Sequence, residues 1–366
     1  MSALLAPGEL VVVRLPTWLG DAVMAEPVLH ALAARQRLRV LAPAKLLDLF
    51  PSLPDDTERR PLTADAPERA RDYAGARAAL LLNGSFRSAF LACAAGVPLR
   101  AGFASGGRRF VLTHALGGAK ERGGLVPGRG AFGRGARALP RPFTLACREL
   151  AGLAGLAIER TAPHLVPNPE AIERVRARRA ELGLDAPFLL VHAGARPGSA
   201  KGVPPVQLAR LTAIVARELG LAPVLCCGPG EEDAARATRA ALWSPAVLLD
   251  APAPGVAELV AWSASAAFVL GPDNGARHVA QALGKRTLVL CGPTDPRHTD
   301  EHERTTRVVR VPVECGPCHR ERCSRASDVL ACFTRLPDAD VLAAARALAR
   351  LETPSGSSSI EPLARS

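Results

Sequence analysis

The chain has 366 residues, a formal net charge of +11 and 48% hydrophobic residues, of which few are aromatic. This length is enough for two domains with a sizeable core. No run of about 18 apolar residues occurs, so we expect no membrane span. The start of the chain lacks a basic region followed by an apolar core, so we expect no signal peptide. Nine cysteines, an odd number, fit a reducing compartment, and we expect a cytoplasmic protein.

Apolar strands alternate with helical patterns along the whole chain. The first half predicts strands at 10–14, 39–42 and 78–82 and helices at 22–34 and 142–153. The second half predicts strands at 188–192, 223–227, 246–249, 267–270 and 287–291 and helices at 169–182, 205–219, 231–242, 256–264, 278–283 and 338–351. Such alternation calls for parallel sheets covered by helices, an α/β architecture.

A proline-punctuated segment, 164–169, is the predicted linker between two domains. The domains would then be 1–165 and 166–352, followed by a Ser/Pro/Gly-rich tail, 353–366, which we expect to be disordered. The segment 104–137 is too rich in glycine for a regular element and is predicted to be a mobile loop.

The first motif, Pro16-Thr17-Trp18-Leu19-Gly20-Asp21, directly follows the first strand. Open α/β sheets bind ligands beyond the carboxyl ends of their strands. A carboxylate there can act as a general base, and Gly20 permits a sharp turn and close approach of a substrate. The alternative is that Asp21 is only the N-cap of the following helix.

The second motif, Gly271-Pro272-Asp273-Asn274-Gly275-Ala276-Arg277-His278, also follows an apolar strand. Gly275 leaves room for a phosphate at the helix amides, Asp273 can orient the turn or bind a ribose hydroxyl, and His278 can contact a diphosphate. The alternative is a second capped helix whose histidine packs inward.

Two further strand ends carry polar residues. His192 to Lys201 combines small residues with a lysine that can neutralise an anion, without the signature of a P-loop or of a dinucleotide fingerprint. Glu231 and Glu232 follow another strand, where either can bind a base or ribose or merely favour a helix N-terminus.

Positive charge is concentrated between Arg100 and Arg148. This stretch holds ten basic residues and one acid, Glu121; the basic residues are Arg100, Arg108, Arg109, Lys120, Arg122, Arg129, Arg134, Arg137, Arg141 and Arg148. Such a surplus predicts an anionic lipid or sugar as partner. Nucleic acid is disfavoured because no recognisable module and few aromatic residues occur. The alternative is a solvated, arginine-rich surface.

The cysteines fall into two groups. Cys93, Cys147, Cys226, Cys227 and Cys291 lie in apolar settings and are predicted to be small core residues. Cys315, Cys318, Cys323 and Cys332 begin with a C-x2-C pair and have the spacing of metal ligands, so a structural zinc is one interpretation. The other is four free thiols that pack a compact loop.

Taken together, these segments resemble glycosyltransferase family 9, in particular its lipopolysaccharide heptosyltransferase II branch. The matching segments are 16–21, 83–88, 96–102, 140–142, 192–195 with Lys201, 273–275 with His278, 290–294 and the cysteine cluster. The chain departs from the family where no aromatic residue stands between Lys201 and Pro204, and where Asp-Asn-Gly replaces Asp-Ser/Thr-Gly.

The resemblance implies a GT-B fold, two Rossmann-like doubly wound domains with the site in the cleft between them. It implies an inverting, metal-independent transfer of heptose from ADP-heptose to the inner core of lipopolysaccharide. The first domain would bind the acceptor and the second the donor. Asp21 would be the base, while Lys201 and His278 would offset charge on the departing diphosphate. The remaining substrate-binding residues would be Thr17, Trp18, Gly20, Asn83, Ser85, Arg87, Ala193, Gly194, Glu231, Glu232, Asp273, Asn274 and Gly275.

The expected partners follow from that activity. They are an ADP-sugar and an anionic acceptor at the inner face of the cytoplasmic membrane, where a monomeric enzyme would be peripheral. No cofactor is expected for catalysis. Two alternatives stay open: a family member that uses another nucleotide sugar for a different envelope glycan, and a non-catalytic nucleotide- or lipid-binding homologue. The presence of Asp21, Lys201, Asp273 and His278 disfavours the second.

Overall fold

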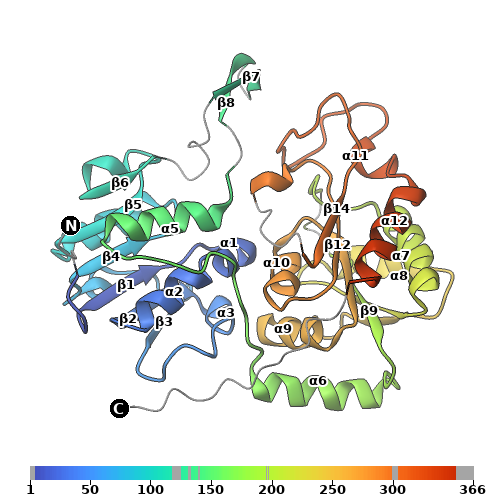
Figure 1. Ribbon diagram of the computed structural model, residues 1–366, viewed down its shortest axis with the longest axis horizontal. Coiled ribbons are helices and arrows are strands. Elements are labelled where there is room, and N and C mark those ends of the chain that lie inside the picture. Colours follow the sequence, from blue (N-terminus) through green and yellow to red (C-terminus); the bar gives the residue numbers. More distant parts are fainter. Residues whose placement is uncertain are drawn as a thin grey trace.

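The computed structural model describes residues 5–117, 141–194, 196, 198–298 and 304–351, together with the backbone of 125–130 and 133–138. Two six-stranded parallel sheets lie side by side, the first in the N-terminal half and the second in the C-terminal half (Figure 1). The predicted disordered tail lies outside the described residues. The α/β class with two doubly wound sheets is confirmed.

The first sheet has the order β3-β2-β1-β4-β5-β6. Its strands are β1 (Leu10–Arg14), β2 (Arg37–Pro43), β3 (Glu58–Leu62), β4 (Ala78–Leu81), β5 (Leu99–Phe103) and β6 (His114–Leu116). The apolar β1 is completely buried at the centre, which explains why the sequence reveals it most clearly.

Helices cover both faces of this sheet. They are α1 (Leu19–Met24), α2 (Glu26–Ala33), α3 (Ala44–Leu47), α4 (Phe86–Ala94) and α5 (Phe143–Leu153), with 3-10 turns η1 (Ala70–Tyr73) and η2 (Arg108–Phe110). One hydrophobic core contains residues of α1, α2 and α5, and a second core on the other side of the sheet contains residues of η1 and α4.

The second sheet repeats the same order, β11-β10-β9-β12-β13-β14. Its strands are β9 (Phe188–His192), β10 (Ala222–Cys226), β11 (Val247–Leu249), β12 (Phe268–Pro272), β13 (Thr287–Leu290) and β14 (Thr306–Val309). Its helices are α6 (Pro169–Glu181), α7 (Pro205–Leu219), α8 (Glu232–Ala241), α9 (Val256–Ser265), α10 (Gly275–Ala282), α11 (Ala331–Thr334) and α12 (Asp338–Ala349), with η3 (Pro296–His298).

Three expectations about local structure were wrong. The helix predicted at 22–34 is two helices that meet at Ala25, because Pro27 has no N–H to continue a hydrogen-bond ladder and instead opens the first turn of α2. The helix predicted from His278 begins at Gly275, capped by the Asn274 side chain. The segment 104–137 holds η2, β6 and an antiparallel pair, β7 (Leu125–Gly130) and β8 (Gly133–Ala138), because backbone pairing needs no side chains.

The two halves are joined by more than the linker. The linker residue Leu165 is buried, and its N–H donates to the carbonyl of Ala282 in α10 at 3.0 Å. Val260, Val279 and Ala282 of the second half belong to a hydrophobic core of the first. Within the described residues, no helix combines the length and apolar character that a membrane span requires.

Candidate active site

The predicted site residues lie at the carboxyl ends of central strands in both sheets. In each sheet the strand order reverses direction beside its central strand, between β1 and β4 and between β9 and β12. Ligands of doubly wound sheets bind at such switch points. The segment 15–21 follows β1 and the Asn83 turn follows β4, while the lysine loop follows β9 and Asp273 follows β12.

The two strongest motifs are in direct contact across the two halves. Helices α1 and α10 pack against each other (Figure 1). Glycines form the contact. A Cβ added at Gly20 would lie 2.6 Å from Cδ2 of His278, and one added at Gly275 would lie 2.8 Å from Cβ of Leu19 and 3.1 Å from N of Gly20. Gly20 and Gly275 therefore allow Asp21, the next residue of α1, to approach the His278 helix. Sequence reasoning assigned both glycines to turns and ligands, and this packing role was missed.

Asp21 is the third residue of α1 and is half-buried. The N-cap of α1 is Trp18, which makes no side-chain capping bond, so the alternative interpretation of Asp21 as an N-cap was wrong. A carboxylate in the first turn is still favoured by the helix dipole. This places an acidic side chain at the α1–α10 contact.

Asp273 anchors a buried polar chain at the start of α10. Its Oδ1 accepts from Nε of Arg277 at 2.6 Å, and its Oδ2 accepts from the hydroxyl of Thr294. Arg277 also donates to Gln281 at 3.2 Å. Burial opposes ionisation of Asp273, but Arg277, His278 and Lys201 outweigh it and hold the pKa of this carboxyl below its usual value. Asp273 thus orients the turn, as one of its two interpretations predicts. Its charge also interacts with those of Lys201 and His278, the two predicted cationic residues.

The lysine loop and Glu231 border the same edge of the second sheet. Lys201 is exposed, and its charge acts on Asp273. The Glu231 carboxylate accepts from the N–H of Gly228 at 3.0 Å and occupies the space that a side chain at Gly194 would need. Backbone hydrogen bonds lower the pKa of Glu232 at the N-terminus of α8. The geometry therefore assigns the helix-terminus role to Glu232 and leaves Glu231 facing the loops of the site.

His192, the last residue of β9, lies beneath this edge. Its Nδ1 is 3.1 Å from Sγ of Cys226, while its Nε2 is buried and has no hydrogen-bond partner among the residues that the structure describes. Burial lowers the pKa of His192 to about 4, so the ring is neutral at neutral pH.

Arg196 is a residue that sequence reasoning missed. Its guanidinium lies 4.9 Å from the centroid of the Trp18 ring, so a cation–π contact links the lysine loop to the start of α1. Trp18 is otherwise 59% exposed. The only available signal was an arginine among small residues, which does not reveal a partner in the other half.

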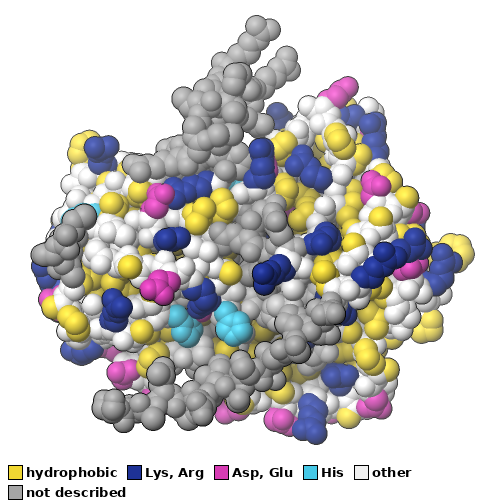
Figure 2. All heavy atoms as spheres, viewed as in Figure 1, with side chains coloured by type: hydrophobic (Ala, Val, Ile, Leu, Met, Phe, Trp, Pro, Cys, Tyr) yellow, Lys and Arg dark blue, Asp and Glu magenta, His cyan; other side chains and the backbone are white. Residues whose placement is uncertain are grey.

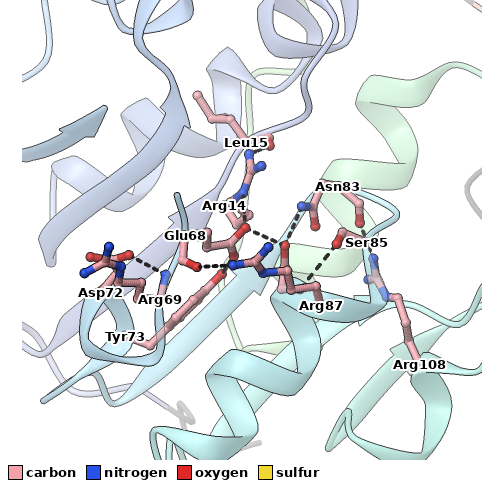
Figure 3. A network of polar contacts seen from close by, with 11 residues as sticks. Arg14, Leu15, Glu68, Arg69, Asp72, Tyr73, Asn83, Ser85, Arg87 and Arg108 are labelled. Carbon is pink, nitrogen blue, oxygen red and sulfur yellow. Dashed lines mark hydrogen bonds and ion pairs between the residues drawn. The ribbon is translucent and has the colours of Figure 1, made fainter. Parts of the chain in front are cut away.

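In the first half, Asn83 and Arg87 belong to a structural network around the buried Glu68 (Figure 3). Glu68 accepts from Nε of Arg14 at 3.1 Å, from the hydroxyl of Ser88 at 3.0 Å and from the hydroxyl of Tyr73. Three predicted ligand-binding residues attach to it or to its neighbours. Asn83 donates to Ser88 at 2.8 Å, Ser85 caps α4 by accepting from the N–H of Ser88 at 3.3 Å, and Arg87 donates to the carbonyl of Glu68 at 3.1 Å. These three side chains hold the loop in shape.

The arginine-rich stretch is not one basic face. Arg108 is fully buried, and its guanidinium donates to the carbonyls of Asn83 and Leu81. Burial lowers its pKa to about 10. Arg100 donates to backbone carbonyls, and Arg141 pairs with Glu149. On the face seen in Figure 2, lysines and arginines are spread over both halves. The side chains of Lys120, Arg122, Arg129, Arg134 and Arg137 lie outside the described residues.

The four clustered cysteines line one small cavity of about 20 Å³, together with Ala200 beside Lys201. Burial raises the pKa of Cys332 to about 11, and the other three thiols add to that effect. In the part of the chain that the structure describes, no three His, Cys, Asp or Glu side chains are placed to hold a metal ion. Of the other five cysteines, four are buried as predicted, and Cys93 is half-buried.

The chain matches a protein-family model and resembles solved structures of known fold. The model described as "Glycosyltransferase family 9 (heptosyltransferase)" matches residues 73–327. An E. coli ADP-heptose LPS heptosyltransferase II is similar at 22% identity with a TM-score of 0.68, over 92% of this chain and 98% of that one. A family 9 glycosyl transferase from Veillonella parvula gives 16% identity and a TM-score of 0.71, over 93% and 97%.

A third solved structure, E. coli heptosyltransferase WaaC with ADP, gives 16% identity and a TM-score of 0.56, over 83% of this chain and 91% of that one. No protein of curated function matches. At these identities the likeness shows the fold, which is GT-B with two Rossmann-like halves.

Proposed function

Because the chain belongs to glycosyltransferase family 9, a family of heptosyltransferases, we propose that it moves heptose from ADP-heptose to the inner core of lipopolysaccharide. As a member of this family the chain is a glycosyltransferase. The observation that carries the proposal is the packing of α1 against α10. It sets Gly20, the residue before Asp21, against His278 of the other half, and the charges of His278 and Lys201 both act on Asp273.

In the proposed reaction, a hydroxyl of the acceptor attacks the anomeric carbon of heptose from the face opposite ADP. Asp21 takes the hydroxyl proton as the new C–O bond forms. The bond from the anomeric carbon to the β-phosphate oxygen breaks, and its electron pair leaves with ADP. Lys201 and His278 offset the charge that develops on the diphosphate, so no metal ion is required. A single displacement of this kind inverts the anomeric centre.

The two halves take different substrates in this proposal. Residues 1–165 bind the acceptor, and residues 166–352 bind the donor. Glu231 faces the nucleoside from the loops of Gly194 and Gly228, and Lys201 and His278 face the diphosphate. The acceptor carries Kdo and lipid A, so the proposed enzyme works at the cytoplasmic face of the membrane; we propose that it does so as a monomer.

A donor panel tests this proposal. The purified chain is incubated with ADP-heptose, UDP-sugars or GDP-sugars and a Kdo-lipid A acceptor, and the product is followed by mass spectrometry and NMR. We expect transfer from ADP-heptose alone, with an inverted anomeric centre and full activity in EDTA. Transfer only from a UDP- or GDP-sugar contradicts the donor, retention contradicts the single displacement, and loss of activity in EDTA contradicts metal independence.

A further inference from the structure

Three exposed phenylalanines gather on neighbouring elements of the first half. Phe86 and Phe90 lie one turn apart on α4 with ring centroids 6.5 Å apart, and Phe110 lies on η2, which packs against α4. Their exposed fractions are 48%, 53% and 92%. Single exposed apolar residues are ordinary, but several large aromatic side chains on adjoining elements indicate an interaction surface.

Exposed arginines lie on the same elements as these rings and on a neighbouring turn. Arg87 is on α4, Arg109 is on η2, and Arg69 and Arg71 are at η1, which also packs against α4. We call the three phenylalanines and four arginines the α4 face. Over residues 66–117 the only acids are Glu68 and Asp72, and both are buried. The exposed charge of this part of the chain is therefore entirely positive.

We propose that the α4 face docks onto an anionic membrane surface, an inference that rests on the proposed function and its lipid-anchored acceptor. Aromatic rings are stable at the boundary of headgroups and acyl chains, and arginines beside them attract anionic headgroups. Neither feature alone anchors a protein firmly, but an apolar insertion combined with a basic patch does. The exposed arginines of the α4 face favour an anionic lipid headgroup over a neutral apolar partner.

The place of the α4 face in the fold fits this role. In a parallel sheet the carboxyl ends of all strands lie at one edge, and α4 follows β4 while η2 follows β5. Helix α1, which carries Asp21, follows β1 at the same edge. Docking through the α4 face therefore brings the edge that carries the base close to the surface from which a lipid-linked acceptor projects.

Co-sedimentation with vesicles tests the docking. Phosphatidylethanolamine vesicles that contain phosphatidylglycerol are compared with phosphatidylcholine vesicles, at low and high salt. We expect binding to the anionic vesicles only. A triple variant, F86S/F90S/F110S, should lose it, and an R71Q/R109Q variant should bind about fivefold more weakly for each arginine. Trp243→Ser is the matched control, because Trp243 is a fully exposed aromatic residue of the second half.

Activity with two acceptors separates this inference from the proposed function. The triple variant should keep wild-type transfer to a water-soluble, delipidated core oligosaccharide and lose transfer to the same core anchored in vesicles. Failure of the wild type to transfer heptose to either acceptor contradicts the proposed function. In that case, the co-sedimentation experiment with vesicles still tests the α4 face independently. Wild-type binding to anionic vesicles by the triple variant overturns the inference. A dimer of the wild type that the triple variant loses in gel filtration also overturns it, because the face then binds a second copy.

Discussion

Gly275→Ala tests whether the close approach of α1 and α10 matters for turnover. The new Cβ would lie 2.8 Å from Cβ of Leu19 and 3.1 Å from the backbone nitrogen of Gly20. Because one neighbour is backbone and the other is a Cβ, neither can rotate away. The contact must open by about 0.6 Å to reach ordinary van der Waals separation. The residue after Gly20 is the proposed base, so this opening moves Asp21 away from the donor loops.

A misplacement of about 1 Å in a catalytic constellation can cost about 100-fold in rate, or about 2.7 kcal/mol. We therefore expect kcat/KM of Gly275→Ala to fall about 10- to 100-fold in a heptose-transfer assay. The matched control is Gly152→Ala in α5, where an added Cβ meets nothing within 4 Å. That variant should keep wild-type activity and gain about 0.5–1 kcal/mol of stability. Wild-type kcat/KM in Gly275→Ala would refute the reasoning.

Three further predictions concern the surrounding structure. Glu68→Gln should lower the free energy of unfolding by about 3–5 kcal/mol in urea titrations, because it leaves Arg14 buried without its anion. The control is Glu58→Gln, which breaks an ion pair whose acid is 40% exposed and should lower the free energy of unfolding by less than about 1 kcal/mol. Equal losses in the two variants would contradict the argument. The pKa of His192 is lowered from 6.5 to about 4 in the folded chain. At a pH between these two values, His192 is therefore protonated in the unfolded chain but neutral in the folded chain. Stability should therefore fall by up to about 3 kcal/mol as the pH drops through this window, and His192→Gln should lack that component; an unchanged pH profile in the variant would count against a buried neutral ring. The four clustered cysteines, as the described residues place them, do not form a metal site, so elemental analysis of protein purified without chelator should find zinc well below one equivalent, and a full equivalent would contradict this prediction.

The sequence predicts the buried centre of each sheet better than its edges. β1 and β9 are continuous apolar runs, and their strand-end motifs could be placed from the alternation alone. β3, with the sequence Glu-Arg-Arg-Pro-Leu, was missed because an edge strand is partly exposed and carries polar side chains. Such a segment has no pattern that distinguishes it from a loop.

The sequence predicts which positions belong to the candidate site, but it does not predict which of these residues contact one another. Asp273 and Lys201 were identified from their places after strands, and the structure brings their charges together. The contact between Gly20 and His278 joins residues more than 250 positions apart, which no local pattern encodes. Arg108 was predicted to be part of the positively charged stretch, because the sequence does not reveal the backbone carbonyls of Asn83 and Leu81 that its buried guanidinium contacts.

The most direct test of the account is the transfer rate of Asp21→Asn. The amide has nearly the shape of the carboxylate but cannot accept the acceptor proton. We predict that kcat falls by about 10²- to 10⁴-fold with ADP-heptose and a Kdo-lipid A acceptor, while the Kd of ADP-heptose stays unchanged. Asp48→Asn, an exposed aspartate at the end of α3, serves as the matched control. Wild-type turnover by Asp21→Asn would contradict the claim that Asp21 at the α1–α10 contact is the base.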